Sequence, residues 1–246
     1  MYDDTGALVR VPGTVRRVVS LVPSLTESVA VTAPGLLVGA TDWCTHPADL
    51  DVTRVKGTKS PSLETVIALQ PDLVLANAEE NREADLDALR DAGLAVWVTY
   101  PRTVPEAVDS LGRMLAACRL GRPDWLAQAE TVWAEPFTGV RRTALVPIWR
   151  RPWMAVGSGT FTGDVLARLG VDNVLGDHEE RYPKVDLASL PPYQLVVLPD
   201  EPYAFSPTDG PESFEVPAAC VSGRHLTWYG PSLVEARDLL TRQLAV

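Results

Sequence analysis

Short apolar segments alternate with amphipathic helical patterns along most of this chain, and this alternation constrains its fold more than any other feature. Residues 18–22 are apolar and rich in β-branched side chains, and Pro23 ends them. Similar strand patterns follow at 36–40, 73–76 and 94–99. Strands that are separated by helices usually pair in parallel, so the pattern predicts an α/β architecture.

The helices expected between these strands have recognisable ends. Ser24 and Glu27 have the spacing of a capping box, which predicts that a helix begins there. Ser62 begins a second helix, which stops at Pro71. A third helix is expected over 84–92, because Gly93 then provides a typical helix end.

Residues 104–138 have a different character, because they contain no strand pattern. Thr103 and Glu106 form another capping box, and apolar side chains then recur at helical spacing. A second helical stretch runs from Asp124 until Pro136 stops it. The apolar stripe and the small amount of Gly and Ser predict a helical connector and not a flexible linker.

The second half of the chain repeats features of the first. Residues 15–23 are echoed by 140–147, and residues 69–75 by 190–196, in the same order and about half a chain apart. Such a repeat favours two similar lobes. We therefore predict two Rossmann-like, three-layer α/β lobes with parallel sheets, at 1–103 and 139–246, bridged by the helical connector at 104–138.

The composition excludes several classes of partner. The 22 basic and 32 acidic residues give a formal net charge of −10, so the chain lacks the basic stripe that nucleic acid or an anionic membrane requires. No run approaches the ~18 apolar residues of a membrane span.

Cellular location is predicted from the cysteines and from the first residues. Cys44, Cys118 and Cys220 lie far apart and are expected to be reduced thiols. The acidic start, with Asp3 and Asp4, does not resemble a signal peptide. We expect a cytoplasmic monomer; the alternative is an exported or cell-surface protein whose signal was removed.

Aromatic side chains gather on the loops that follow the predicted strands. The chain has seven Trp, six Tyr and four Phe, and nine of these lie on such loops. They are Trp43, Trp149, Trp153, Phe161, Tyr182, Tyr203, Phe205, Trp228 and Tyr229. Ligands of open α/β sheets bind beyond the carboxyl ends of the strands, so two facing lobes would share one cleft there. The aromatic set predicts a cleft for a large, flat ligand, although several of these side chains could instead close the ends of the lobes.

Other loop residues leave alternatives open. Asp42, Cys44 and His46 alternate and include a thiolate and an imidazole, which suit zinc or copper, but an ordinary turn explains them as well. His225 lies among aromatic residues and is a candidate ligand contact. The stretch 157–163 precedes a helix expected from Asp164, and it either holds an anion or forms a plain turn.

Acidic loop clusters are a further candidate, and motifs of catalysis are missing. Glu79-Glu80 and the cluster at 178–180 either contact a ligand or are only solvated. The sequence contains no GxSxG elbow, no Walker A motif and no HExxH. We therefore expect no catalytic residues, no metal site and no cofactor of the protein's own.

Five segments of the chain carry a resemblance to a known family. They are VVSLVPSLTE at 18–27, LQPDLVL at 69–75, IWRRPWM at 148–154, LPDEPY at 198–203 and WYGP at 228–231. Together they resemble the class III, helical-backbone substrate-binding proteins of ABC importers for cobalamin, haem and ferric siderophores. The resemblance covers nearly the whole chain, from about Thr5 to the end.

The resemblance implies two lobes bridged by a rigid helix, a shallow cleft and a small hinge motion. By position, Trp43, Asn77, Tyr182, Trp228 and Tyr229 are similar to residues that line the cleft in this family. Cobalamin binders of the family also present one surface glutamate on each lobe to the permease. Glu64 matches the first of these, whereas Ala188 stands where the second is expected.

We therefore predict reversible binding of a metal-chelate small molecule, such as a corrinoid, haem or a ferric siderophore, in an aromatic cleft between the lobes. The expected contacts are Trp43, Asn77, Trp149, Trp153, Phe161, Tyr182, Tyr203, Trp228, Tyr229 and His225. One alternative is the exported binding component of an ABC importer, which docks on its permease through Glu64. A second is an enzyme acting on a tetrapyrrole or metal chelate, with His46, His225 or Glu201 at the cleft.

Overall fold

The computed structural model describes residues 1–246, which divide into two compact units. Unit 1 consists of Met1–Pro101, Glu106–Gln128 and Tyr229–Pro231. Unit 2 consists of Arg102–Pro105, Ala129–Trp228 and Ser232–Val246. The segment that we expected as a connector contains helices α4 (Val104–Ala117) and α5 (Asp124–Ala134), and it is divided between the two units.

Unit 1 contains a five-stranded parallel sheet with the strand order β3-β2-β1-β6-β7. Its strands are β1 (Val18–Ser20), β2 (Leu37–Ala40), β3 (Thr53–Arg54), β6 (Leu73–Asn77) and β7 (Val96–Thr99). A small antiparallel hairpin, β4 (Lys56–Gly57) and β5 (Ser60–Pro61), follows β3. The four longer strands lie where the sequence predicted them.

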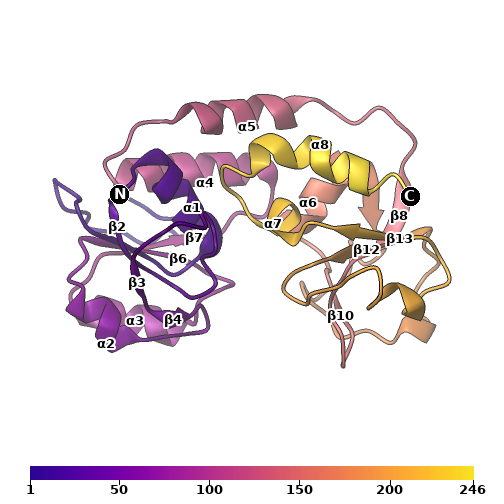
Figure 1. Ribbon diagram of the computed structural model, residues 1–246, viewed down its shortest axis with the longest axis horizontal. Coiled ribbons are helices and arrows are strands. Elements are labelled where there is room, and N and C mark those ends of the chain that lie inside the picture. Colours follow the sequence, from indigo (N-terminus) through magenta and orange to yellow (C-terminus); the bar gives the residue numbers. More distant parts are fainter. The chain divides into compact units, whose positions relative to one another are not determined.

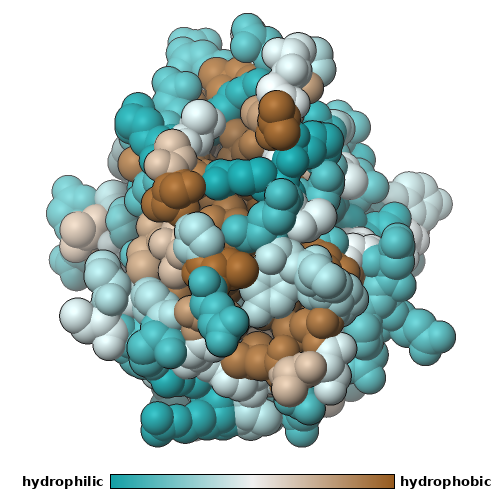
Figure 2. Space-filling model, turned by 90° about the vertical axis from the view of Figure 1, so that its right-hand side faces the viewer, coloured by the Kyte–Doolittle hydropathy of each residue, from teal (hydrophilic) through white to brown (hydrophobic).

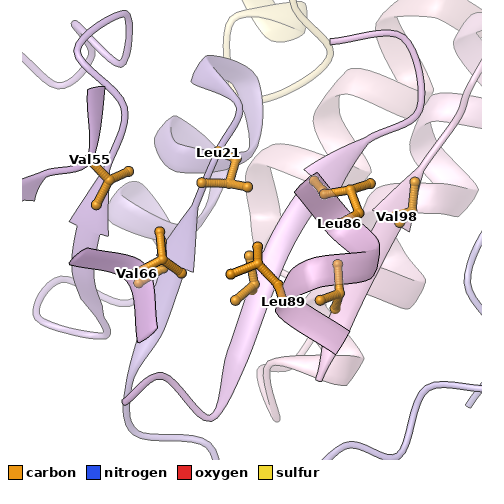
Figure 3. Close-up of a cluster of buried hydrophobic side chains, with 10 residues drawn as sticks. Leu21, Val55, Val66, Leu86, Leu89 and Val98 are labelled. Atoms are coloured by element: carbon orange, nitrogen blue, oxygen red, sulfur yellow. The ribbon is translucent and has the colours of Figure 1, made fainter. Parts of the chain in front are cut away.

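Helices cover both sides of the unit 1 sheet. Helices α2 (Leu63–Ala68) and α3 (Glu83–Asp91) lie on one side, and α1 (Pro23–Thr32) and α4 lie on the other (Figure 1). Figure 3 shows the core between the sheet and the first pair, where Val66 and Leu89 from the helices meet side chains such as Leu21 and Val98. Burial of these apolar side chains holds the strands, and therefore the loops at their carboxyl ends, in place.

Unit 2 contains a four-stranded parallel sheet with the order β11-β8-β12-β13. Its strands are β8 (Arg142–Leu145), β11 (Val171–Asn173), β12 (Leu195–Pro199) and β13 (Ala218–Val221). Helices α6 (Phe161–Arg168), α7 (Gly223–Thr227) and α8 (Leu233–Gln243) cover one side of this sheet (Figure 1).

The other side of the unit 2 sheet is covered without a long helix. It carries the hairpin of β9 (Pro147–Trp149) and β10 (Met154–Ala155), two 3-10 helices, η1 (Leu187–Ser189) and η2 (Pro211–Ser213), and loops. The core there joins strand residues such as Leu145 and Leu198 to the loop residue Phe205. Figure 2 shows hydrophobic patches separated by hydrophilic side chains on the face that lies at the right of Figure 1.

The repeat predicted from the sequence is confirmed by the topology. In the order of strands across each sheet, β2-β1-β6-β7 of unit 1 corresponds to β11-β8-β12-β13 of unit 2. The register is kept as well, because Val74 pairs with Val96 and Val196 pairs with Ala218, each pair 22 positions apart. The two-lobed parallel α/β prediction is therefore correct.

Two helix starts differ from the prediction. Helix α1 begins at Pro23 with Val22 as its N-cap, so Ser24 lies inside the first turn and does not cap the helix. Proline is well suited to this first position because its φ is fixed near the helical value. Helix α6 begins at Phe161 and not at Asp164, because Thr160 caps it by accepting a hydrogen bond from Gly163 N. None of the helices combines the length and hydrophobicity that crossing a bilayer requires.

Candidate functional site

Trp43 lies on the loop after β2 and is the most exposed of the predicted aromatic contacts, with 66% of its surface accessible. The N–H of Asp42 donates to the carbonyl of Lys56 at 2.9 Å, which joins the loop to the β4–β5 hairpin. A β-carbon built on Gly57 would lie only 3.5 Å from Trp43 Nε1, so the indole lies against this glycine. The loop therefore presents a positioned, flat and accessible aromatic face.

Cys44 anchors the same loop from the inside. Its thiol is buried, accepts a hydrogen bond from Thr26 Oγ1 at 3.0 Å and lies 3.1 Å from Thr41 Oγ1. Burial raises the pKa of the Cys44 thiol, which favours the neutral thiol over the thiolate that binds metals. Asp42 is exposed, and His46 Nδ1 lies 3.1 Å from Thr45 Oγ1. The structure holds no cluster of three His, Cys, Asp or Glu side chains that could bind a metal ion.

Asn77 and Tyr229 meet in the interior of unit 1. Asn77 is the last residue of β6, and its Nδ2 donates to the Tyr229 hydroxyl at 2.7 Å. Thr99, at the end of β7, lies 2.8 Å from the same hydroxyl. Asn77 and Tyr229 are each 5% exposed. The structure therefore brings two of the predicted contacts together as partners of each other.

The aromatic residues that follow β8 and β12 in unit 2 pack largely on one another. Trp153 stacks on Phe205 with ring centroids 6.0 Å apart, and Tyr203 lies 4.6 Å from Phe205. The Arg150 guanidinium lies 5.4 Å from the Trp153 ring centre. Trp149 meets Tyr203 edge to face at 5.7 Å and remains 43% exposed. Trp149 thus offers an accessible face, whereas Trp153 and Tyr203 contribute to the packing of the unit.

Phe161 and Tyr182 lie near the glycine-rich stretch of unit 2. Phe161 is buried as the first residue of α6, and Tyr182 is 37% exposed. A β-carbon on Gly157 would lie 2.1 Å from the carbonyl oxygen of Glu180, so this glycine is packed against the chain before Tyr182. With Thr160 on the Gly163 N–H, the stretch has the contacts of a capped turn, which favours the plain-turn alternative over an anion site.

Trp228 and His225 lie on the segment after β13 and are both buried. Trp228 Nε1 donates to Glu201 Oε2 at 3.1 Å, and burial raises the pKa of Glu201 above its usual range. His225 Nδ1 lies 2.7 Å from Ser222 Oγ, and its Nε2 lies 2.9 Å from Glu235 Oε1. The hydrogen bond from His225 lowers the pKa of Glu235. These contacts fix α7 to α8 and to the turn after β12.

Several residues of these networks were not predicted from the sequence. Thr99, Gly57 and Ser222 each end or follow a strand, which is the only local signal that could have drawn attention to them. Glu235 lies on α8, ten residues after His225, and only the tertiary structure relates the two.

The remaining predicted surface residues lie on exposed turns. Glu64 is in the first turn of α2 and is exposed, and Ala188 is exposed in η1. In the acidic cluster, His178 Nδ1 accepts a hydrogen bond from the Glu180 N–H at 2.9 Å. That cluster is therefore partly organised by its own backbone.

No family model matches the chain, but it is similar in sequence to curated proteins. It is 23% identical over 194 residues to a "Vitamin B12-binding protein" of Vibrio cholerae, which covers 76% of this chain and 70% of that protein. It is 22% identical over 246 residues to a protein of the same name from Pectobacterium carotovorum, which covers 93% of this chain and 88% of that one.

Solved structures share the fold across almost the whole chain. The periplasmic vitamin B12-binding protein BtuF of Vibrio cholerae matches with a TM-score of 0.78 and 19% identity, over 95% of this chain and 98% of that one. CeuE of Helicobacter pylori with bound Ni(II) matches with a TM-score of 0.82 and 14% identity, over 100% and 88%. The haem-binding protein BhuT, in complex with two haems, matches with a TM-score of 0.70 and 21% identity, over 93% and 97%. The curated relatives are named for binding and not for catalysis, in agreement with the prediction of a non-enzymatic protein.

Proposed function

We propose, from the shared fold and the distant sequence similarity, that the chain is a class III substrate-binding protein and that it binds a corrinoid reversibly. Its scaffold is that of binding proteins for cobalamin, haem and metal chelates. A corrinoid is chosen among these because both sequence relatives described above are vitamin B12-binding proteins.

The observation that carries this proposal is the exposed and positioned indole of Trp43. Trp43 is 66% exposed at the carboxyl end of a parallel sheet, which is the edge where ligands of open α/β sheets bind. Trp149 and Tyr182 present further accessible aromatic surface in unit 2. Rigid aromatic faces suit a flat macrocycle, because they supply contact area at a small cost in conformational entropy.

A titration of tryptophan fluorescence tests the proposal. Aquocobalamin, haemin and a ferric siderophore are added in parallel, and saturable quenching at one ligand per chain is expected for aquocobalamin. Trp43→Phe should remove much of the quenching. Trp125→Phe is the matched control, because Trp125 lies on α5 with its Nε1 bonded to Thr32 Oγ1. Saturable quenching by haemin or the siderophore alone would assign a different chelate. No saturable response to any of the three would refute the function.

A second candidate is the role of binding component in an ABC importer, supported by the exposed carboxylate of Glu64 on α2. A solved relative is described as periplasmic, which gives this candidate its context. Glu64→Gln should leave ligand affinity unchanged and abolish uptake if docking depends on this residue. The cytoplasmic location stays our prediction, and cell fractionation with an antibody against the chain decides between the two.

A further inference from the structure

Tyr229 takes part in a hydrogen-bond chain whose direction can be worked out from donor counts. Thr99 Oγ1 donates its single hydrogen to the carbonyl of Ala76 at 3.0 Å. The Tyr229 hydroxyl, 2.8 Å away, must therefore donate to Thr99 Oγ1. Asn77 Nδ2 then donates to the Tyr229 oxygen at 2.7 Å. The chain runs from Asn77 through Tyr229 and Thr99 to Ala76.

This arrangement leaves the Tyr229 hydroxyl committed to the protein. Its hydrogen is used by Thr99, one lone pair is used by Asn77, and the residue is 5% exposed. Burial holds the pKa of Tyr229 far above its usual value, so the phenol stays neutral. Gly230 keeps the segment close to α1, since a β-carbon there would lie 2.9 Å from Ser28 Oγ.

The other end of the Asn77 side chain holds a turn. Asn77 Oδ1 accepts hydrogen bonds from the N–H groups of Glu79 at 2.7 Å and Glu80 at 3.2 Å. Asn81 closes the turn, because its Oδ1 accepts from Asn77 N at 2.9 Å and its Nδ2 donates to the carbonyl of Thr58 at 3.0 Å. An asparagine that bonds the amides two and three residues on is a common means of fixing such a turn.

The turn that contains Glu80 is joined to the β4–β5 hairpin, against which Trp43 lies, because Asn81 Nδ2 donates to the carbonyl of Thr58 and Lys59 Nζ donates to the carbonyl of Glu79. Burial raises the pKa of the Tyr229 hydroxyl and of the Cys44 thiol, and the negative charge of Glu80 adds to both shifts. Cys44 is the residue next to Trp43 in the chain. Glu80 itself is only partly buried. A carboxylate in this position can accept hydrogen bonds from the amide groups at the edge of a corrinoid.

We propose that Tyr229 is a positioning residue of the ligand site, which acts through Asn77 to fix the turn at residues 77–81 and so to present Glu80 to the ligand. This inference rests on the proposed function for its ligand. It changes the role predicted for Tyr229 and Asn77, from direct contacts to the support of a contact.

A double-mutant cycle tests the inference, with aquocobalamin as the probe. Tyr229→Phe removes only the hydroxyl and should weaken binding about tenfold. Glu80→Gln should weaken it by a similar factor. The double variant should lose no more than about a further twofold, because the two changes act through the same contact. Tyr2→Phe is the matched control, since Tyr2 is 66% exposed near the N-terminus.

Amide hydrogen exchange supplies a readout that does not depend on any ligand. In Tyr229→Phe the amides of Glu79 and Glu80 should exchange at least tenfold faster, whereas Tyr2→Phe should leave them unchanged. Asn77→Ala is a second variant, which removes the acceptor of these amides directly. It should also weaken aquocobalamin binding and speed the exchange of the Glu79 and Glu80 amides, so it keeps the test open if Tyr229→Phe folds poorly.

Three results would overturn the inference. Additive losses of affinity in the cycle would show that Tyr229 contacts the ligand independently of Glu80. Faster exchange in Asn77→Ala but not in Tyr229→Phe would show that the hydroxyl does not fix the turn. A lower melting temperature with unchanged affinity and exchange would reduce Tyr229 to a purely structural role. If the wild-type chain binds none of the probes, the proposed function fails, and the exchange experiment still decides whether Tyr229 positions the turn.

Discussion

Replacing Trp43 by alanine should weaken ligand binding without unfolding the protein. A fully covered aromatic side chain of this size buries roughly 150–250 Å². Trp43 is 66% exposed in the free protein, so a ligand that lies on one face of the indole can cover roughly 60–80 Å². At about 25 cal/mol per Å² this area contributes about 1.5–2 kcal/mol, which corresponds to a roughly 10- to 30-fold loss of affinity.

The free energy of unfolding should change much less. The Trp43 side chain is 66% exposed, and substitutions at such exposed positions usually change the free energy of unfolding by less than about 0.5 kcal/mol. Isothermal calorimetry with aquocobalamin gives the affinity, and urea unfolding gives the stability. An unchanged dissociation constant in a normally folded Trp43→Ala protein would refute the assignment of this face to the ligand.

Three other changes give sharp expectations. Gly157→Ala places a β-carbon 2.1 Å from the carbonyl oxygen of Glu180 and should lower the free energy of unfolding by about 3 kcal/mol, measured by urea unfolding. Gly13→Ala is the control, because the added carbon there meets nothing within 4 Å. Burial raises the pKa of Glu201, so its contribution to stability is present at low pH and is lost as pH rises above about 4.5, the usual value for this group. Glu201→Gln keeps an oxygen that can accept the Trp228 N–H but cannot ionise. The free energy of unfolding of this variant should therefore fall less between pH 4 and 7 than that of the wild type. An equal fall in both proteins would contradict a raised pKa of Glu201. Finally, a corrinoid whose edge carries amides should bind at least tenfold more tightly than one with carboxylates in their place, because Glu79 and Glu80 lie on the turn and the chain carries a net charge of −10; equal affinities at low ionic strength would contradict this.

The sequence was sufficient for the fold because strand and helix patterns are set by local periodicity. The segments 36–40, 73–76 and 94–99 became β2, β6 and β7 with shifts of only one or two residues at their ends. The repeat also came from local composition, since both copies need apolar strands followed by similar turns. The capping residue of α1 was misassigned because Pro23 and Ser24 are both good helix starters, and only the backbone decides between them.

The candidate site was less predictable, because burial depends on residues that are distant in the sequence. Position after a strand correctly placed Trp43 on an accessible loop, whereas Trp149, which is also accessible, ends the short strand β9. The same rule could not reveal that Trp153 would stack on Phe205, or that Tyr229 would bond to Asn77 across 152 positions of the chain. Aromatic composition alone does not distinguish a side chain that meets a ligand from one that meets another side chain.

The repeat also explains why Trp228 and Tyr229, although aromatic and adjacent, are better suited to support than to contact. Tyr229 is held by Asn77 at the end of β6, and Trp228 by Glu201 just after β12, which is the equivalent strand of the other unit. The turn after each strand supplies a hydrogen-bonding group that suits the aromatic residue it holds. An indole N–H can only donate, so it needs an acceptor such as the Glu201 carboxyl oxygen, whereas a phenol oxygen whose hydrogen already goes to Thr99 can accept from an N–H such as that of the Asn77 amide. Two neighbouring residues whose polar atoms are each matched in this way have little hydrogen-bonding capacity left for a ligand. The accessible faces of Trp43 and Trp149 have no such commitment, and for this reason the test of function begins with Trp43.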